Sequence, residues 1–179
     1  MYLHVKILNM QIAQIQLDEI DRVRKQWKRE QPDLDTSSME TIGRTLRLQF
    51  LFSVRMRRVL SRYDIDPGGF DMLATLRRSG PPYRMTPTRL YKDLVITSGA
   101  VTHRMDALEK AGLLERRTDP QDRRSMLACL TAKGRHVIDA AMRDHLAAEA
   151  ELTDCLTQQE HKTLAQLLKR ILLEVEEEK

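Results

Sequence analysis

The sequence predicts a mainly α-helical fold with one small β-hairpin. Two short segments, TPTRLYKDL and SGAVTHRMDALEKAG, space their apolar residues as helices do and lie close together in the chain. The next segment, LLERRTDPQDRRSMLACLTAKG, has two apolar stretches on either side of an arginine-rich tip, which is typical of a hairpin. Apolar residues before and after this region also recur with helical spacing, so further helices are expected on both sides of it.

The first 64 residues are expected to form two amphipathic helices. Apolar residues recur mostly three to five apart over residues 3–30, which predicts one long helix that ends before Pro32. Ser37 and Glu40 have the spacing of a capping box, so a second helix is expected to begin there and to end near Tyr63. The apolar stripes of both helices need a packing partner, and residues 1–64 are therefore expected to take part in dimerisation.

Three helices are expected between residue 65 and the hairpin. Asp66-Pro67 and Thr86-Pro87 each place a capping side chain before a first-turn proline, which is typical of a helix start. Ser98 begins the next helix, and β-strands are expected only within residues 113–131. Two helices joined by a tight turn and followed by a charged hairpin constitute a winged helix-turn-helix domain, which we assign to residues 65–134.

Residues 135–179 are expected to form two further helices that take part in dimerisation. Thr157 and Glu160 repeat the capping-box spacing and start the last helix. Its apolar residues form a stripe like that of a coiled coil: Leu164, Leu167, Leu168, Ile171, Leu172 and Val175. This side of the helix is too apolar to face water, so it is expected to pack on the N-terminal helix of its own chain or of a second copy.

The composition favours an anionic partner over a membrane or a catalytic role. The chain has 30 basic and 26 acidic residues, and its arginines cluster in residues 55–62, 77–89 and 116–124. No apolar run approaches the roughly 20 residues that cross a bilayer, and the first residues lack a signal-peptide pattern, so a cytoplasmic protein is expected. The sequence has no phosphate-binding glycine loop, no HExxH motif and no nucleophile elbow, so neither enzymatic activity nor a cofactor is expected.

The two cysteines, Cys129 and Cys155, lack a CxxC or histidine-rich context, which argues against a zinc site and a disulfide framework. Oxidation sensing by either thiol stays open. An adaptor role also stays open, in which the terminal helices bind protein partners and the hairpin does not bind DNA. Binding to the promoter DNA of its own gene distinguishes a regulator from such an adaptor.

The helix that begins at Ser98 is expected to read DNA in the major groove, which admits a helix and displays a distinct pattern for each base pair. Its apolar residues Val101, Met105 and Leu108 share one side, so the opposite side is free for DNA. The residues expected to contact bases or phosphates are Ser98, Thr102, His103, Asp106 and Lys110 of this helix and Arg116, Arg117, Arg123 and Arg124 of the hairpin. Asp122 would repel phosphate, so it is expected to pair with Arg124 or another arginine and to hold the hairpin in shape.

The segment TSGAVTHRMDALEKAGLLERRTDPQDRRSMLACLTAKG resembles the signature of the MarR (multiple antibiotic resistance regulator) family. It includes the D-x-R element of that family at Asp122 and Arg124 and its closing L-T-x-x-G at residues 130–134. The resemblance covers residues from about 20 to 179 and implies a homodimeric winged-helix regulator, usually a repressor, which binds double-stranded DNA at a pseudo-palindromic operator. In such a protein the N- and C-terminal helices build the dimer interface.

A narrower resemblance, in WKREQPDLDTSSMETIGR, FDMLATLRRSGPPYRMTP and THRMD, is to the urate-responsive, PecS-like branch of this family. The ligand-binding residues that this branch implies are matched here by Trp27, Asp71, Arg78 and Arg104, so the N-terminal helices would form part of the ligand pocket. Asp71 and Arg78 would lie on one helix face about 10.5 Å apart, which leaves room for a ligand between them. The function predicted from the resemblance is a repressor that a purine-type anion such as urate releases from its operator. The alternative is a MarR-like regulator that responds to another small aromatic ligand or to thiol oxidation.

Overall fold

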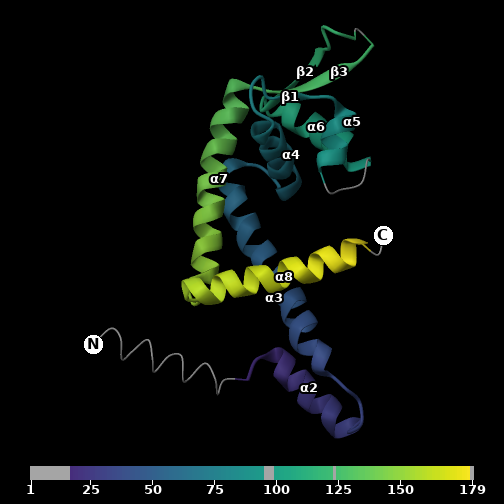
Figure 1. The fold of residues 1–179 in the computed structure, drawn as a ribbon. Coiled ribbons are helices and arrows are strands. Elements are labelled where there is room, and N and C mark those ends of the chain that lie inside the picture. Colours follow the sequence, from purple (N-terminus) through teal and green to yellow (C-terminus); the bar gives the residue numbers. More distant parts are fainter. Residues whose placement is uncertain (1–16, 95–98, 123, 178–179) are drawn as a thin grey trace, which may run out of the picture. The chain divides into compact units, whose positions relative to one another are not determined.

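The structure is a computed structural model that describes residues 17–94, 99–122 and 124–177. The chain forms two compact units, Met1–Ser53 and Val54–Lys179. Helices dominate the described residues, and a small antiparallel sheet belongs to the second unit (Figure 1). The predicted fold class, mainly helical with a small β-hairpin, is confirmed.

Helix α2 (Glu19–Glu30) of the first unit begins at a capping box that the helical periodicity did not predict. The Asp18 carboxylate accepts a hydrogen bond from the backbone N–H of Asp21 at 2.9 Å, and the Asp21 carboxylate accepts one from the Asp18 N–H at 3.2 Å. This reciprocal cap starts the helix at residue 19, so the prediction of one uninterrupted helix over residues 3–30 is wrong at residues 17 and 18. Residues 1–16 of that predicted helix lie outside the described residues.

Helix α3 (Ser37–Leu60) begins at the predicted residue, but the predicted capping box is wrong. Ser37 is already helical and donates its backbone N–H to the Asp35 carboxylate at 2.8 Å. The Glu40 carboxylate forms an ion pair with Arg24 of α2. A partner that approaches from another helix has therefore taken the carboxylate that the local spacing assigned to the cap.

Further contacts join α2 and its capping residue Asp18 to the N-terminal part of α3. The Arg44 guanidinium pairs with the carboxylates of Asp18 and Asp21, both at 2.7 Å. The hydrogen bond from Arg44 lowers the pKa of Asp18 from its ordinary value. Gly43 allows the close approach of the helices, because a Cβ there would lie 2.9 Å from Cδ1 of Ile20.

Three helices of the second unit begin where their predicted capping residues place them. The bounds are η1 (Ser61–Tyr63), α4 (Pro67–Arg78), α5 (Pro87–Asp93), α6 (Gly99–Lys110), α7 (Ala132–Thr153) and α8 (Gln158–Glu177). Asp66 accepts a hydrogen bond from the Gly69 N–H at 2.7 Å at the start of α4, and Thr86 accepts one from the Arg89 N–H at 3.2 Å at the start of α5. The capping box of Thr157 before α8 is also present, through bonds of 2.7 and 3.3 Å with Glu160.

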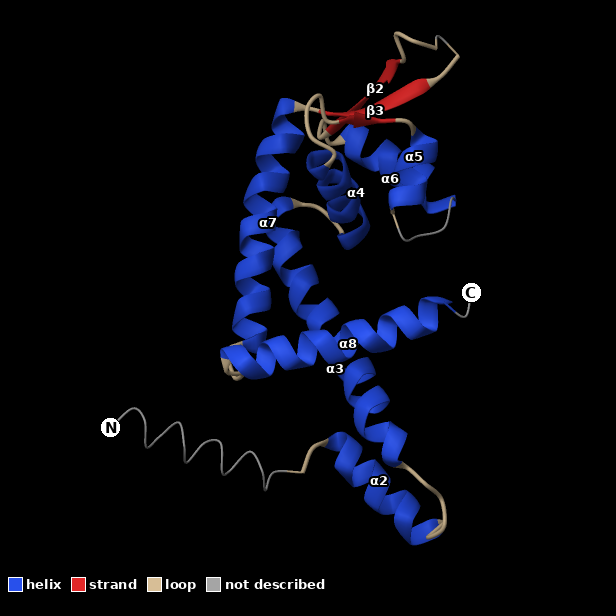
Figure 2. Cartoon of the chain, viewed as in Figure 1, coloured by secondary structure: helices blue, strands red, loops and turns tan. Residues whose placement is uncertain are grey.

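Three short antiparallel strands form the sheet in the order β1-β3-β2 (Figure 2). Their bounds are β1 (Arg84–Met85), β2 (Leu114–Thr118) and β3 (Met126–Leu130). Strands β2 and β3 are the predicted hairpin, with Leu114 opposite Leu130. Strand β1 lies before residue 113, so the expectation that strands are confined to residues 113–131 is wrong. Two residues are too few to show an alternating pattern, and β1 is a strand only because β3 pairs with it.

Helix α4 is central to the core of the second unit. Met72, Leu73 and Leu76 on this helix are fully buried. They belong to one cluster with Leu90 of α5, Met105 and Leu108 of α6, Leu114 of β2 and Ile138 of α7. Because α4 contacts α5, α6 and α7, a change at α4 reaches both helices of the helix-turn-helix.

Gly134, which closes the L-T-x-x-G segment, lies in the first turn of α7 against the backbone of Leu113. A Cβ at this position would lie 2.0 Å from the Leu113 carbonyl oxygen and 2.9 Å from the carbonyl carbon. The same oxygen accepts a hydrogen bond from the Thr131 N–H at 3.2 Å, which holds it in place. We expect Gly134→Ala to lower the free energy of unfolding by about 2–4 kcal/mol, measured by urea denaturation.

A matched control for this prediction is His136→Ala, an exposed substitution in the same turn of α7. Its expected effect is within about 0.5 kcal/mol, because surface changes without special contacts are nearly neutral. Equal free energies of unfolding for the two variants would contradict the steric role of Gly134.

Membrane-spanning helices and metal-binding clusters are both absent from the part of the chain that the structure describes. None of the helices in residues 17–94, 99–122 and 124–177 is long and apolar enough to cross a membrane. The same residues contain no group of three or more His, Cys, Asp or Glu side chains that suits a metal ion.

Candidate functional site

Helix α6 has the two faces that its sequence predicts. Met105 and Leu108 are buried against the core. The opposite side exposes the predicted DNA-contacting residues Thr102, His103, Asp106 and Lys110. The side chain of Val101 and the residue Ser98 lie outside the described part of the chain. The exposed face is polar and free of contacts with the core, as a helix that enters a groove requires.

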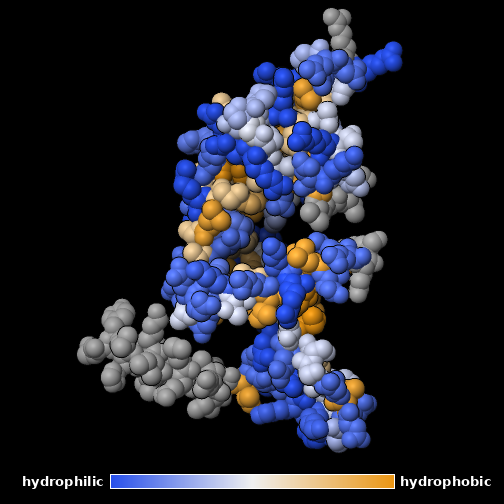
Figure 3. Space-filling model, viewed as in Figure 1, coloured by the Kyte–Doolittle hydropathy of each residue, from blue (hydrophilic) through white to orange (hydrophobic). Residues whose placement is uncertain are grey.

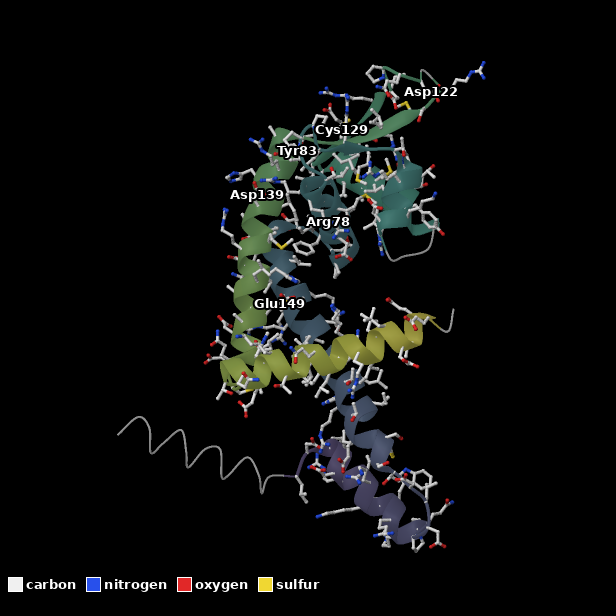
Figure 4. All side chains as sticks on the ribbon, viewed as in Figure 1. Arg78, Tyr83, Asp122, Cys129, Asp139 and Glu149 are labelled. Carbon is white, nitrogen blue, oxygen red and sulfur yellow. The ribbon has the colours of Figure 1, made fainter. Side chains whose placement is uncertain are left out.

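The wing, formed by β2, β3 and the loop between them, ends in a charged turn. The Asp122 carboxylate accepts a hydrogen bond from the backbone N–H of Arg124 at 3.0 Å, and its carbonyl accepts one from the Ser125 N–H at 2.8 Å. Figure 4 shows Asp122 at the tip, and Figure 3 shows that the surface of the wing is mainly hydrophilic. Asp122 thus shapes the turn, as predicted, but it contacts Arg124 through the backbone. Arg124 is exposed, and Arg123 lies outside the described residues.

Arg116 connects the wing to helix α6. Its guanidinium pairs with Asp106 at 2.5 Å and with Glu109 at 2.6 Å, and its backbone N–H donates to Glu109 at 3.1 Å. The hydrogen bond to Asp106 is the main cause that raises the pKa of Arg116. Two predicted DNA-contacting residues, Arg116 and Asp106, therefore contact each other, so Arg116 reaches a phosphate only by leaving these carboxylates. Arg117 is exposed and pairs with Glu115 at 2.6 Å.

Arg104 points from α6 back toward the protein. Its side chain is partly buried, and its guanidinium lies over Gly68 in the first turn of α4. The Nη1 atom of Arg104 is buried and has no hydrogen-bond partner among the described residues. Arg104 lines a cavity of about 230 Å³ together with Asp66, His103 and Leu108. Arg104 thus lies at the boundary between the packed and the exposed side of α6, as the helical period predicts from the sequence.

A second cavity, of about 300 Å³, lies beside α4 and contains two of the predicted ligand-binding residues. Asp71, Thr75 and Arg78 of α4 line it, and the other lining residues are Phe70, Ala74, Asp93, Leu94 and Met142. The Arg78 guanidinium, labelled in Figure 4, donates to the Asp93 carbonyl at 3.2 Å. Thr75 is only 2% exposed, and its hydroxyl oxygen has no hydrogen-bond partner among the described residues. The cavity thus joins a guanidinium, a carboxylate and an unpaired hydroxyl.

The electrostatics around Asp71 connect this cavity with Arg104. The carboxylate keeps an exposed side, yet the loss of water around it raises its pKa, and this is the largest influence on it. The positive charges of Arg104, His145 and Arg78 act in the opposite direction, in that order of size. Arg104 and Arg78 therefore both act on the same carboxylate. His145 stacks on Phe70 with 4.7 Å between the ring centroids.

Trp27 belongs to the first compact unit, where it lies on α2 with 42% of its surface exposed. Its participation in a ligand pocket with Asp71, Arg78 and Arg104 stays a prediction. Thr75 and Phe70 were not predicted as site residues. The helical spacing of Asp71, Thr75 and Arg78, which are four and three residues apart, was the signal that could have identified Thr75.

Comparison with known proteins places this architecture in one family. Residues 65–126 match the family model described as "MarR family". The chain is 35% identical over 153 residues to the HTH-type transcriptional regulator PecS of Dickeya dadantii, and the similarity covers 86% of this chain and 92% of that protein. It is 34% identical over 131 residues to the multiple antibiotic resistance protein MarR of Salmonella typhimurium, covering 70% and 89% of the two chains.

Solved structures agree with the sequence relatives. A mutant of MarR from E. coli, crystallised with operator DNA, is similar with a TM-score of 0.65 at 30% identity, covering 77% of this chain and 99% of that one. Apo wild-type MarR from E. coli has a TM-score of 0.61 at 31% identity, covering 73% and 96%. These relatives are regulators and not enzymes, which confirms the class predicted from the sequence. With a similarity to PecS that spans most of both chains, this protein belongs to the MarR family of transcriptional regulators.

Proposed function

We propose that this protein is a homodimeric cytoplasmic repressor that releases its operator when a purine-type anion such as urate binds beside α4. The observation that carries the proposal is the cavity in which Asp71, Thr75 and Arg78 converge. The likeness to PecS supports a regulator of the predicted branch. A mutant of MarR from E. coli has been crystallised with operator DNA. We infer that the present protein binds DNA in a similar manner.

The lining of the cavity suits a small planar anion. The flat guanidinium of Arg78 can bind an oxyanion through two parallel hydrogen bonds. A polar ligand atom would supply the hydrogen-bond partner that the Thr75 hydroxyl lacks among the described residues. This favours binding, because a buried hydroxyl without a hydrogen bond lowers the stability of the protein. Phe70, Leu94 and Met142 provide apolar walls for the faces of a ring. The volume of about 300 Å³ is at the lower end of the range for small-molecule pockets.

Ligand charge is the proposed signal. An anion beside Arg78 adds a like charge next to Asp71, whose pKa is already raised by partial loss of water. Asp71 then takes up a proton or moves, and either change alters the field at Arg104 of helix α6. Release of DNA follows if the ligand binds more tightly to the arrangement of α6 that fits the groove poorly.

The DNA-binding surface in this proposal consists of α6 and the wing. Thr102, His103, Asp106 and Lys110 read the major groove, with Ser98 near the phosphates. Arg117, Arg123 and Arg124 contact phosphates or the minor groove, and Arg116 holds the wing on α6 or exchanges its carboxylates for a phosphate. Two such surfaces in a symmetric dimer fit a pseudo-palindromic operator.

Helix α8 supports the dimer in this proposal. No residue of α8 is buried within the single chain. The exposed apolar residues of its stripe are Leu164, Leu167, Leu168, Ile171, Leu172 and Val175. Figure 3 shows apolar surface among charged side chains around this helix. An apolar area of this kind is stable in water only when a partner covers it, and a second copy of the chain is that partner.

Thiol oxidation is the second candidate signal, and the two cysteines differ in their suitability. Cys129 is buried in β3, and its burial raises the pKa of the thiol, which disfavours the reactive thiolate. Cys155 is exposed before α8. If a peroxide releases the operator and Cys155→Ser removes that response, the signal is oxidation at Cys155.

The proposed function is tested by titrating urate and xanthine into the complex with fluorescein-labelled operator DNA and following the anisotropy. We expect urate to release the DNA and to change the emission of Trp27, which is the sole tryptophan of the chain. A flat anisotropy with unchanged emission for both purines would exclude the purine ligand. Membership of the MarR family would be unaffected by that outcome.

A further inference from the structure

Two adjacent glycines in the first turn of α4 face helix α6. A Cβ on Gly68 would lie 2.2 Å from Cζ and 2.3 Å from Nε of Arg104. A Cβ on Gly69 would lie 3.3 Å from Cδ2 of Leu108. Arg104 and Leu108 are four residues apart, so they follow each other on one face of α6. Helix α6 therefore lies along the two glycines, with Arg104 on the first and Leu108 on the second.

Hydrogen bonds to the described residues do not explain why Arg104 occupies this place. The N-terminus of a helix carries partial positive charge, so the guanidinium stands at the unfavourable end of α4. Its Nη1 atom is buried and finds no hydrogen-bond partner among the described residues. The negative charge of Asp71 attracts the guanidinium, and the missing side chain of Gly68 leaves the space that the guanidinium fills.

We infer that Gly68 is a positioning residue for the recognition helix. It leaves the space that the Arg104 side chain fills against α4 and thereby fixes where the guanidinium of Arg104 lies. His103 and Asp106 lie near Arg104 on the exposed side of the same helix, and displacing the guanidinium is inferred to disturb the face that they present to DNA. This inference rests on DNA binding by α6 and is independent of the identity of the ligand.

The test is a double-mutant cycle on the full chain with Gly68→Ala, Arg104→Ala and both together. A methyl group on residue 68 expels the guanidinium, so each single variant is expected to weaken operator binding roughly tenfold. The double variant is expected to bind as weakly as either single variant and not a hundredfold more weakly, because Arg104 is no longer present to be displaced. The higher helix propensity of alanine is common to both backgrounds and cancels in the cycle.

Thermal unfolding of the same four proteins gives a readout that does not need DNA. We expect Gly68→Ala to lower the melting temperature in the wild-type background and not in the Arg104→Ala background. If Gly68→Ala fails to fold, recovery of a folded protein in the double variant supports the inference, and an unfolded double variant overturns it.

Pro67→Ala, an exposed change in the same turn, serves as the control and should show no coupling to Arg104. Operator affinities that multiply across the cycle, or a Gly68→Ala protein that binds as the wild type does, overturn the inference. If no variant and no wild-type protein binds operator DNA, the melting cycle still decides whether Gly68 holds Arg104.

Discussion

Replacing Leu168 by aspartate is expected to separate the proposed dimer into monomers of 20.8 kDa and to abolish operator binding at nanomolar protein concentration. Leu168 is the middle of the apolar stripe on α8, with Leu164 and Leu172 one turn away on either side. All three are more than 40% exposed in the single chain, so their burial energy is available only to a partner. The change places a carboxylate in the surface that the partner would cover.

The size of this effect follows from symmetry. Burial of one leucine contributes about 1.5–3 kcal/mol. In a twofold-symmetric dimer the substitution occurs twice in the interface, so its effect on the free energy of dimerisation is doubled. The desolvation of a carboxylate adds to this loss, so the dimer dissociation constant should rise by roughly a thousandfold or more. Operator affinity falls with it, because a monomer binds each half-site separately and loses the effective concentration that the dimer provides.

Sedimentation equilibrium measures the dimer, and anisotropy with labelled operator measures the affinity. Gln166→Asp is the matched control, because it adds the same charge to α8 on the side away from the stripe. We expect that control to remain dimeric. A dimeric Leu168→Asp protein with unchanged operator affinity would show that α8 is not the interface.

Arg78→Gln is expected to raise the urate concentration for half-release of the operator by about 10–150-fold, measured against the unliganded complex of the same variant. The range corresponds to the roughly 1.5–3 kcal/mol that a hydrogen bond to a charged group contributes. Arg78 lines the cavity beside α4, and among the described residues its guanidinium donates a hydrogen bond only to the Asp93 carbonyl. The other N–H groups of that guanidinium are therefore available to an anion, whereas those of a fully paired arginine are not.

Arg77→Gln is the control for this prediction. The two arginines are neighbours on α4, but the Arg77 guanidinium is paired with Asp139 of α7 at 2.7 Å. Loss of Arg77 should affect stability and leave the urate concentration for half-release within about twofold. Thr75→Val adds a second arm, because it should stabilise the unliganded protein by removing an unpaired buried hydroxyl while weakening urate binding. If Arg77→Gln and Arg78→Gln shift the urate response equally, the ligand does not bind at Arg78.

Local chemistry made several features predictable from the sequence. The caps at Asp66, Thr86 and Thr157 each involve a side chain and a backbone N–H three residues later, so the spacing contains the whole interaction. The two faces of α6 follow from the helical period in the same way, as does the shared face of Asp71 and Arg78 on α4.

Features that join distant segments were decided only by the tertiary structure. Strand β1 exists because β3 pairs with it, and Arg116 contacts Asp106 and Glu109 because the wing folds back on α6. The place of Arg104 over Gly68 likewise depends on how closely α4 and α6 approach. A spacing rule describes neighbours along the chain, whereas these contacts depend on packing between elements, and packing is sensitive to single atoms. The sequence by itself thus determined most of the helices, the hairpin, the faces of α6 and the family resemblance. The tertiary structure decided the third strand, which charged side chains are already paired and which of the described ones remain free to bind a ligand or DNA.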